Sequence, residues 1–461
     1  MMQKLLTKVK SIFSSNIVRG SLFLCVSAFI CKIIGVVYRI PLTNIIGAEG
    51  VGLYQLVFPI YSFLLVISSN GIPVALSKLI AQKRQELNFA YLNKLKKISF
   101  LFFGALGLIM TGLLMVFAEK ISAWQGNSNA YLGYLFIAPS VLIVSFICVF
   151  RGLFQGLKSM RPTGVSQIIE QSIKFVFGLI LPVLFVANGI YFQVGMATLA
   201  VTISELIALS YLFVKSKTNN QYKDIFCVCS GRLVKTKDVF VDILKNVLPI
   251  TLSNCIIPIS VLIESFFIVN ILQQSTNLVT ATEVYGVYSG VVAVLINAPI
   301  VLASSTGIAL VPNIAEKNCT QAEVDKQNED NKIFKEAIFL CLLISVPSSL
   351  FFALFSNFTI EVLYPALSDD LIILSSQMLA CSAINVITLS LSYILIYYLQ
   401  TCISLYKPVV CLLIMNALRL VLGVISLTKW GVLAYVVFGA FVYLMQLLQL
   451  LQIKHMNKCR K

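Results

Sequence analysis

Eight charged side chains lie within long apolar stretches of the sequence, where an unpaired charge would face lipid. Charges in such places usually face protein or a water-filled cavity, and they mark substrate paths or ion paths. Their types and spacing therefore indicate transport of a polar group through a membrane rather than catalysis. Five are basic and three are acidic: Lys32, Arg39, Lys78, Lys174 and Arg419, with Glu170, Glu205 and Glu264.

The bases predict a site for an anion. Lys32 and Arg39 are seven residues apart, so they share one face of a helix. Ammonium and guanidinium groups in a low-dielectric cavity would attract a phosphate, and arginine can bind two oxygens at once. The alternative is that either base reaches a membrane face with its long side chain, or that Lys78 anchors the cytoplasmic end of its helix. The candidate substrate-binding residues are Lys32, Arg39, Lys78 and Arg419.

The acidic residues predict either ion pairs or ion coupling. Glu170 precedes Lys174 by four residues on one helix face, which favours a local ion pair. Glu205 and Glu264 have no local partner, and a buried carboxylate can carry Na⁺ or a proton. The alternative for each is a base on another helix. The candidates for ion coupling or ion pairing are Glu170, Lys174, Glu205 and Glu264. The coupling ion would be Na⁺ or H⁺.

Two short segments with proline interrupt apolar stretches. They are Asn70-Gly71-Ile72-Pro73 and Asn297-Ala298-Pro299. Proline frees backbone carbonyls and permits a helix to bend. We expect helix breaks there, which serve either as gating points or only as packing kinks.

The elements that must position these residues are membrane-spanning helices. The chain has 461 residues, of which 58% are hydrophobic and 12% are charged, and soluble domains carry roughly twice that charged fraction. With about 20 apolar residues per span, the sequence predicts an all-α integral membrane protein with about twelve transmembrane helices. The predicted spans are 20–45, 52–80, 98–118, 131–150, 164–187, 189–214, 243–271, 285–311, 336–356, 371–399, 408–427 and 430–453.

The distribution of basic residues predicts the orientation. With the N-terminus inside, the inner segments hold 28 of the 35 lysines and arginines, and the outer loops hold only Lys120 and Lys429. Both termini are therefore expected in the cytoplasm. Bases placed between apolar segments also argue against nucleic-acid binding, which needs one basic surface.

Cysteine and histidine form no metal-binding pattern. Most of the twelve cysteines lie in apolar runs, Cys227 and Cys229 are a lone pair in a polar loop, and His455 is the only histidine. We expect no metal and no organic cofactor. The apolar stretch after the basic N-terminus is too long for a cleaved signal peptide, so it is predicted to be the first helix.

The two halves of the chain look like repeats. The first match pairs Gly52-Leu53-Tyr54 with Gly286-Val287-Tyr288, and the second pairs Ser68 to Ile72 with Ser304 to Ile308. The segments around Lys174 and Arg419 also correspond. Parallel repeats are typical of transporters, with the substrate path at their interface. The predicted organisation is a basic N-terminus (1–19), an N-lobe of helices one to six (20–214), a cytoplasmic linker (215–242), a C-lobe of helices seven to twelve (243–453) and a basic tail (454–461).

Two segments resemble a known family. The first runs from Lys32 to Gln55 as KIIGVVYRIPLTNIIGAEGVGLYQ and continues to Lys78, and the second runs from Arg151-Gly152-Leu153-Phe154-Gln155-Gly156 to Glu170-Gln171. Both resemble the stage V sporulation protein B and polysaccharide-exporter branch of the multidrug/oligosaccharidyl-lipid/polysaccharide (MOP) flippase superfamily, to which lipid II flippases are related.

The resemblance implies a pair of six-helix lobes arranged as a V, alternating access, and a lipid-pyrophosphate-linked saccharide as cargo. That cargo would be a peptidoglycan or polysaccharide precursor, moved from the inner to the outer leaflet of a bacterial plasma membrane. Relatives that flip lipid II also place bases in the first helix around a glycine, as Gly35 lies here. The partners expected are this saccharide and membrane lipids, and the protein is expected to be a monomer and not an enzyme.

Three alternatives remain open at this point. A cation-coupled drug antiporter of the same superfamily should have an acidic cavity, whereas bases predominate in these spans. A membrane-embedded glycan polymerase or transferase usually needs a large outer loop with catalytic groups, and the predicted outer loops are short. A scaffold without transport activity would not require buried charges.

Overall fold

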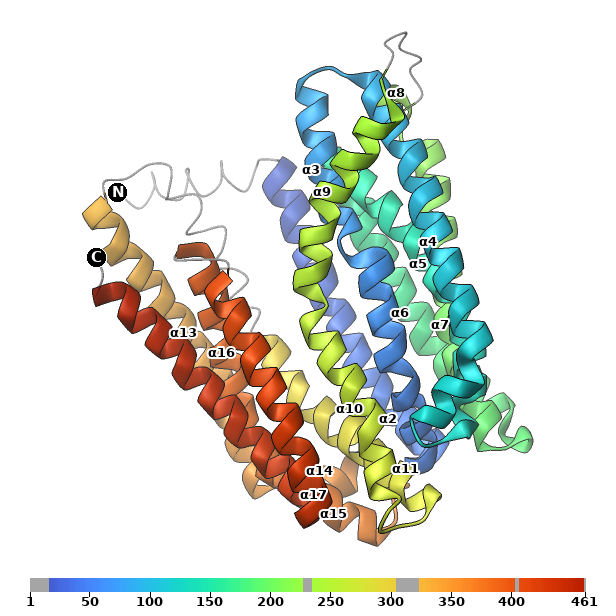
Figure 1. Cartoon of the computed structure of the whole chain (residues 1–461), viewed down its shortest axis with the longest axis vertical. Helices are drawn as coiled ribbons and strands as arrows, with labels where there is room; N and C mark the ends of the chain where they lie inside the picture. Colours follow the sequence, from blue (N-terminus) through green and yellow to red (C-terminus); the bar gives the residue numbers. More distant parts are fainter. Residues whose placement is uncertain (1–15, 227–233, 304–322, 403–405, 460–461) are drawn as a thin grey trace. The chain divides into compact units, whose positions relative to one another are not determined.

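The computed structural model describes residues 16–226, 234–303, 323–402 and 406–459, and every regular element among them is a helix (Figure 1). This confirms the predicted all-α membrane class. The apolar composition makes helices necessary, because a helix bonds its own backbone groups where water is absent.

Helices one and two meet at a single glycine. The helix α2 (Asn16–Leu65) contains Gly47 with φ 69° and ψ 179°, which separates two helical segments. This conformation is almost restricted to glycine. A π-turn, η1 (Val66–Asn70), follows, and α3 (Ile72–Gln85) then begins with Pro73 in its first turn. The break predicted at Asn70-Gly71-Ile72-Pro73 is therefore present.

The remaining helices of the first half match the predicted spans closely. They are α4 (Phe89–Trp124), α5 (Tyr131–Gly156), α6 (Arg161–Leu184) and α7 (Ile190–Thr218), with the short turns η2 (Ser128–Ala130) and η3 (Val186–Asn188) between them. A short helix, α8 (Asn220–Phe226), begins the predicted linker; Cys227 and Cys229 lie outside the described residues.

Two spans of the second half that were predicted as single helices are bent pairs. The span 243–271 divides into α9 (Thr236–Asn254) and α10 (Ile256–Leu272), bent by 53°. Pro258 has no N–H to donate to the carbonyl of Asn254, which explains the break. The span 371–399 divides into α15 (Asp369–Ser382) and α16 (Ile384–Cys402), bent by 42°. Here the Ser382 hydroxyl donates to the carbonyls of Met378 and Leu379, a contact that often bends helices.

The eighth span is irregular, though not where the sequence predicted. It begins as α11 (Leu278–Gly286), passes through the π-turn η4 (Val287–Val292), and stays helical through Asn297 and Pro299 to Ala303. The interruption expected at Asn297-Ala298-Pro299 is thus displaced toward the start of the helix. The segment Ser304 to Ile308, which was matched to the first half, lies outside the described residues.

The last elements are α13 (Glu323–Leu354), the short α14 (Ser356–Leu363) and α17 (Tyr406–Cys459). Gly431, with φ 80° and ψ −171°, divides α17 into two helical segments. Within the described residues, eight helices are long and apolar enough to cross a membrane, or ten with the two bent pairs. Dividing the two longest at Gly47 and Gly431 gives the predicted twelve.

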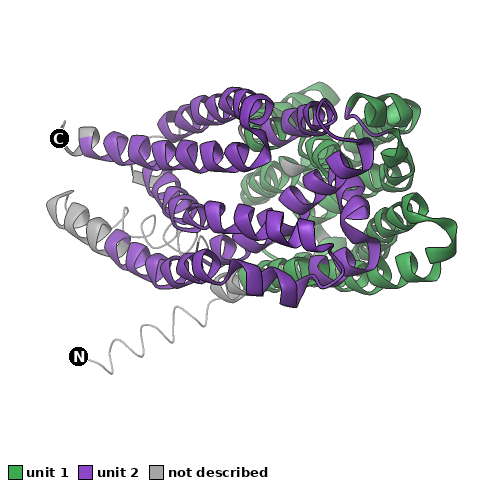
Figure 2. Ribbon diagram, turned by 90° about the horizontal axis from the view of Figure 1, so that it is seen from below, with its two compact units in different colours: residues 1–38, 56–124, 128–259 green, residues 39–55, 125–127, 260–461 purple. Residues whose placement is uncertain are grey.

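The chain forms two compact units, coloured in Figure 2. Unit 1 comprises residues 1–38, 56–124 and 128–259, and unit 2 comprises 39–55, 125–127 and 260–461. The units differ from the predicted lobes in two places. The segment 234–259 packs with unit 1 because α9 contacts α3 and α4, and the segment 39–55 packs with α11 of unit 2. Whether two six-helix lobes act as functional halves stays a prediction.

Glycines permit a close contact between two helical segments of unit 2. A Cβ atom on Gly52 would overlap the carbonyl oxygen of Thr282, and one on Gly286 would lie 2.5 Å from the backbone nitrogen of Gly52. Small residues allow membrane helices to approach in this way. The two glycines that open matching segments of the repeat therefore pack against one another.

One further feature supports the repeat. Gly189, between α6 and α7, has φ 87° and ψ 165°, almost the conformation of Gly431 in α17.

Candidate functional site

Unit 2 contains a buried ion pair between two helices. Arg419 on α17 binds Glu264 on α10 through both terminal nitrogens, with Nη2 2.7 Å from Oε2 and Nη1 3.2 Å from Oε1. The side chains are only 9% and 8% exposed. A bidentate, charge-assisted pair of this kind is strong and fixes the planes of both groups.

Tyrosines surround this ion pair. The Tyr288 hydroxyl donates to Glu264 Oε1 at 3.2 Å, and its ring meets the edge of the Tyr435 ring at 5.3 Å between centroids. The Arg419 guanidinium lies 5.7 Å from the centre of the Tyr443 ring. Aromatic faces favour a guanidinium there, so the aromatic side chains and the carboxylate hold Arg419 in one position.

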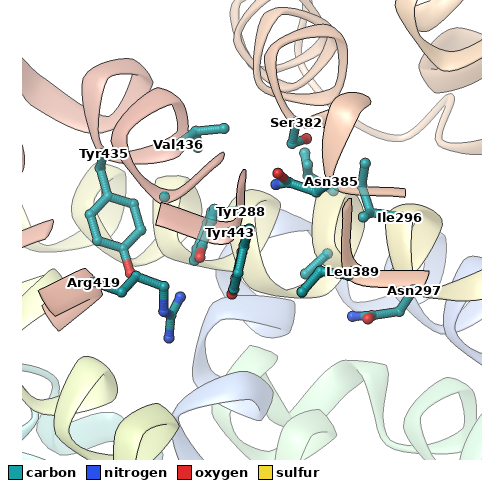
Figure 3. Close-up of a pocket in the computed structure, with 13 residues that line it drawn as sticks. Tyr288, Ile296, Asn297, Ser382, Asn385, Leu389, Arg419, Tyr435, Val436 and Tyr443 are labelled. Atoms are coloured by element: carbon teal, nitrogen blue, oxygen red, sulfur yellow. The ribbon is translucent and has the colours of Figure 1, made fainter. Parts of the chain in front are cut away.

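A cavity of about 110 Å³ adjoins the pair within unit 2 (Figure 3). Two buried polar atoms of its lining residues, Arg419 Nε and Asn385 Oδ1, have no hydrogen-bond partner in the described part of the chain. Asn297 is exposed, so the cavity reaches the surface of the unit. The polar lining residues are Tyr288, Asn297, Ser382, Asn385, Arg419, Tyr435 and Tyr443.

Three of the residues predicted from the sequence lie at this ion pair and cavity. The sequence predicts Arg419 as a substrate-binding residue, and in the structure its guanidinium forms an ion pair with Glu264. Glu264 was considered for ion coupling, but it pairs with a base on another helix, which was the alternative. Asn297 lines the cavity rather than breaking its helix.

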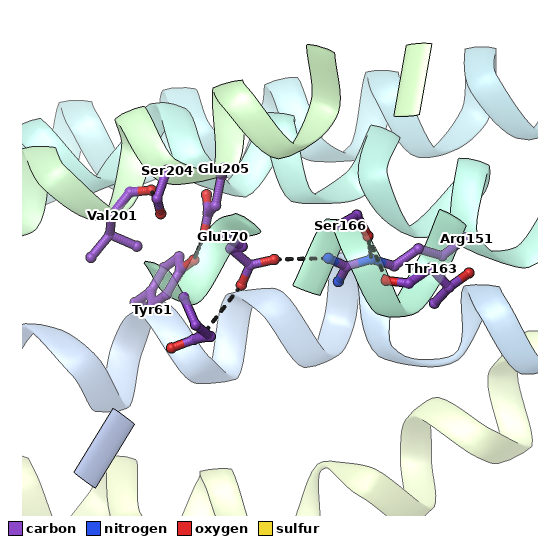
Figure 4. A network of polar contacts seen from close by, with 9 residues as sticks. Tyr61, Arg151, Thr163, Ser166, Glu170, Val201, Ser204 and Glu205 are labelled. Carbon is purple, nitrogen blue, oxygen red and sulfur yellow. Dashed lines mark hydrogen bonds and ion pairs between the residues drawn. The ribbon is translucent and has the colours of Figure 1, made fainter. Parts of the chain in front are cut away.

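Unit 1 contains a second polar network (Figure 4). Arg151 on α5 donates from Nη2 to Glu170 Oε2 at 2.8 Å and from Nε to the Ser166 hydroxyl at 3.0 Å. The predicted pair between Glu170 and Lys174 is therefore wrong. Lys174 instead lies over the rings of Tyr38 and Phe58, 5.8 and 5.1 Å from their centres. Helical spacing permits contact between residues four apart, but Arg151 offers a better-oriented fork.

Glu205 has different surroundings from the other two acids. It is 3% exposed, and its Oε1 accepts a hydrogen bond from the Tyr61 hydroxyl at 2.5 Å. Ser140 on α5 also lies close to this carboxyl group. No ion pair joins Glu205 to a base among the residues that the structure describes.

The other three candidate bases do not lie in either network. Lys32 and Lys78 are exposed and Arg39 is half-buried, and none forms an ion pair within the described ranges. Lys32 and Lys78 belong to unit 1 and Arg39 to unit 2. Beside Lys32, the first helix exposes an apolar stripe with helical spacing, formed by Val26, Ile30, Ile33 and Val37.

Sequence reasoning missed three polar residues of these networks. Arg151 was assigned to a cytoplasmic segment, although it lies within α5 and within the family-like motif. Tyr61 and Asn385 are single polar residues in apolar stretches, and they gave no pattern that distinguished them from other tyrosines and asparagines. Their uncharged side chains do not stand out from an apolar run as intramembrane charges do.

The comparisons with known proteins agree with this fold and with these motifs. The model of the polysaccharide biosynthesis protein family matches residues 17–318, more than half of the chain. The chain belongs to this family. Among its relatives is stage V sporulation protein B of Bacillus subtilis, 29% identical over 75% of this chain and 66% of the relative, so the chain spans slightly under two thirds of that protein. Lipid II flippase MurJ of the same organism is 23% identical over 92% of this chain and 82% of the relative.

Solved structures of MOP-superfamily transporters share the fold of this polysaccharide biosynthesis family member. An inward-facing multidrug resistance transporter of the MATE family superimposes with a TM-score of 0.75 and 14% identity, over 93% of this chain and 94% of the other. Lipid II flippase MurJ in an inward closed conformation gives a TM-score of 0.71 and 14% identity, over 94% and 87%. The protein is thus a multi-pass membrane protein with the all-helical fold of membrane transporters and flippases.

Proposed function

We propose that this protein is a flippase that moves a lipid-linked saccharide from the inner to the outer leaflet by alternating access. Its family and the relatives named as a sporulation protein and a lipid II flippase support this class of cargo. We further propose a location in the bacterial plasma membrane, with both termini in the cytoplasm, and a monomer as the working form.

The observation that carries the proposal is the position of Lys32. Its side chain is exposed on the first helix, and the exposed Phe29 lies between it and the exposed stripe of Val26, Ile30, Ile33 and Val37. A lipid pyrophosphate has the matching chemistry, because its phosphates would pair with the ammonium while its hydrocarbon chain covers the apolar stripe. Arg39, seven residues further on in the sequence, stays a second candidate base.

A drug antiporter is the weaker candidate. Cationic drugs need an accessible, unpaired carboxylate. Glu264 and Glu170 are paired with arginines, and Glu205, which has no ion pair among the described residues, is only 3% exposed. Coupling of transport to Na⁺ or H⁺ through Glu205 stays a prediction.

The decisive experiment compares Lys32→Ala with the wild type in proteoliposomes that contain a fluorescent lipid-linked saccharide. Loss of a charge-assisted contact of about 1.5–3 kcal/mol should lower the transport rate about ten- to hundredfold. The control is Lys120→Ala, which removes an exposed base near the C-terminal end of α4. This variant should transport the lipid at the wild-type rate. In cells, depletion should cause the lipid-linked intermediate to accumulate on the inner leaflet. Normal transport by a stably inserted Lys32→Ala protein would overturn the role of this base.

A further inference from the structure

The cavity of unit 2 contains a donor and an acceptor that the protein leaves unsatisfied. Arg419 Nε is buried and donates to nothing, and Asn385 Oδ1 is buried and accepts from nothing among the described residues. Both side chains line the cavity and are 8% exposed. Buried polar groups in native proteins usually have partners. A ligand for this cavity should therefore both donate and accept hydrogen bonds.

The described lining of the cavity has no net charge. Among the described residues that line it, Arg419 alone is charged, and the Glu264 carboxylate binds both of its terminal nitrogens. An anion or a cation would have to lose its hydration shell here without meeting an unpaired opposite charge, which is unfavourable. The expected ligand is therefore neutral.

The remaining walls combine aromatic and amide side chains. Tyr288 and Tyr435 form an edge-to-face pair, and Tyr443 lies beside Arg419 (Figure 3). Tyrosine offers an apolar face and a polar tip. A sugar ring has C–H groups that pack on such faces, and each of its hydroxyls can donate and accept. A lipid tail, by contrast, would leave both Arg419 Nε and Asn385 Oδ1 unsatisfied.

From these observations we propose that this cavity binds a neutral sugar ring of the cargo glycan. The pyrophosphate would then be bound elsewhere, at bases that have no carboxylate partner. The proposal rests on the proposed flippase function and adds to it a separate site for the saccharide.

Binding of free sugars tests the cavity directly. Saturation-transfer NMR on the full chain in nanodiscs would compare neutral N-acetylglucosamine with cationic glucosamine and anionic glucose 6-phosphate. The neutral sugar should bind more tightly than either charged one. Asn385→Ala should weaken its binding about tenfold, which corresponds to one lost hydrogen bond, and Tyr443→Phe is a milder second variant that keeps the ring. Asn44→Ala is the control in the same unit, because Asn44 is a half-buried asparagine that does not line the cavity; its amide nitrogen donates to the carbonyl of Leu363 at 2.9 Å.

Three results would overturn the sugar site: no binding of N-acetylglucosamine to the wild type, equal binding by the wild type and both cavity variants, or tighter binding of glucose 6-phosphate that depends on Asn385. A transport arm separates this proposal from the flippase function. Asn385→Ala should lower the transport rate of a lipid pyrophosphate that carries the sugar about tenfold. The transport rate of the sugar-free lipid pyrophosphate should not change. Transport of neither lipid by the wild type would reject the flippase function, while the binding result would still decide the sugar site.

Discussion

At the scale of single residues, the acidic side chains of the spans divide by their partners. Glu264 and Glu170 each bind an arginine on another helix, whereas Glu205 accepts a hydrogen bond from the Tyr61 hydroxyl. The first two are therefore structural links between helices. Glu205 has no ion-pair partner among the described residues, and ion coupling through it stays a prediction.

The ion pair between Arg419 and Glu264 gives a test of that distinction. Arg419→Ala would leave a buried carboxylate without its partner, which should destabilise the protein by about 3–5 kcal/mol. A double variant, Glu264→Leu with Arg419→Met, removes both charges and should recover most of the lost stability. Thermal unfolding of the purified proteins measures this. Equal melting temperatures for the single and double variants would contradict a structural pair.

The sequence alone identifies the charged residues within the spans, but it does not identify the residues with which they pair. The eight intramembrane charges were visible because charge is rare in apolar runs. Their partners were not, because Arg151 and Glu170, or Arg419 and Glu264, meet only after the helices have packed. The spacing of four residues between Glu170 and Lys174 predicts an ion pair within one helix, but contacts between helices determine the partner of Glu170.

At the scale of elements, glycines define the turns between spans. Gly189 and Gly431 have backbone dihedrals that other residues adopt only with strain, and at both positions an added Cβ atom would have no other atom within 4 Å. Gly189→Ala and Gly431→Ala should therefore cost about 1–3 kcal/mol each through backbone strain alone.

Gly112→Ala is the control for these two glycines. Gly112 lies within α4, with nothing within 4 Å of an added Cβ and with no positive φ, so alanine should be neutral or stabilising by up to about 1 kcal/mol. Melting temperatures of the three variants provide the comparison. A loss of stability in Gly112→Ala as large as in Gly431→Ala would remove the argument from dihedral angles.

Helix positions were predictable from hydrophobicity, but their bends were only partly so. The twelve spans follow from the length of the apolar runs, and the break at Asn70 to Pro73 follows from its proline. The bends at Cys255 and Ala383 were missed, because prolines and serines occur in many straight membrane helices. Near Pro299 the helix continues, and the irregular turn forms earlier, at Val287–Val292.

At the scale of the whole molecule, the distribution of bases predicts the orientation in the membrane. A single cysteine introduced at Lys217, in a background without the native cysteines, should react with an impermeant maleimide only from the cytoplasmic side. A cysteine at Lys429 should react only from outside. Labelling of position 217 in intact cells would overturn the predicted topology.

The division of the chain between the two units has a practical consequence for dissecting the protein. The boundaries after Tyr38, Gln55, Trp124, Asn127 and Ile259 mean that neither unit is one continuous piece of polypeptide. A fragment that ends at residue 214 would lack α9, which belongs to unit 1. It would also contain residues 39–55 of unit 2 without the rest of that unit. Co-expressed half-proteins should therefore be divided near Ile259 and not in the polar loop. Even then the first half must supply residues 39–55 and 125–127 to unit 2.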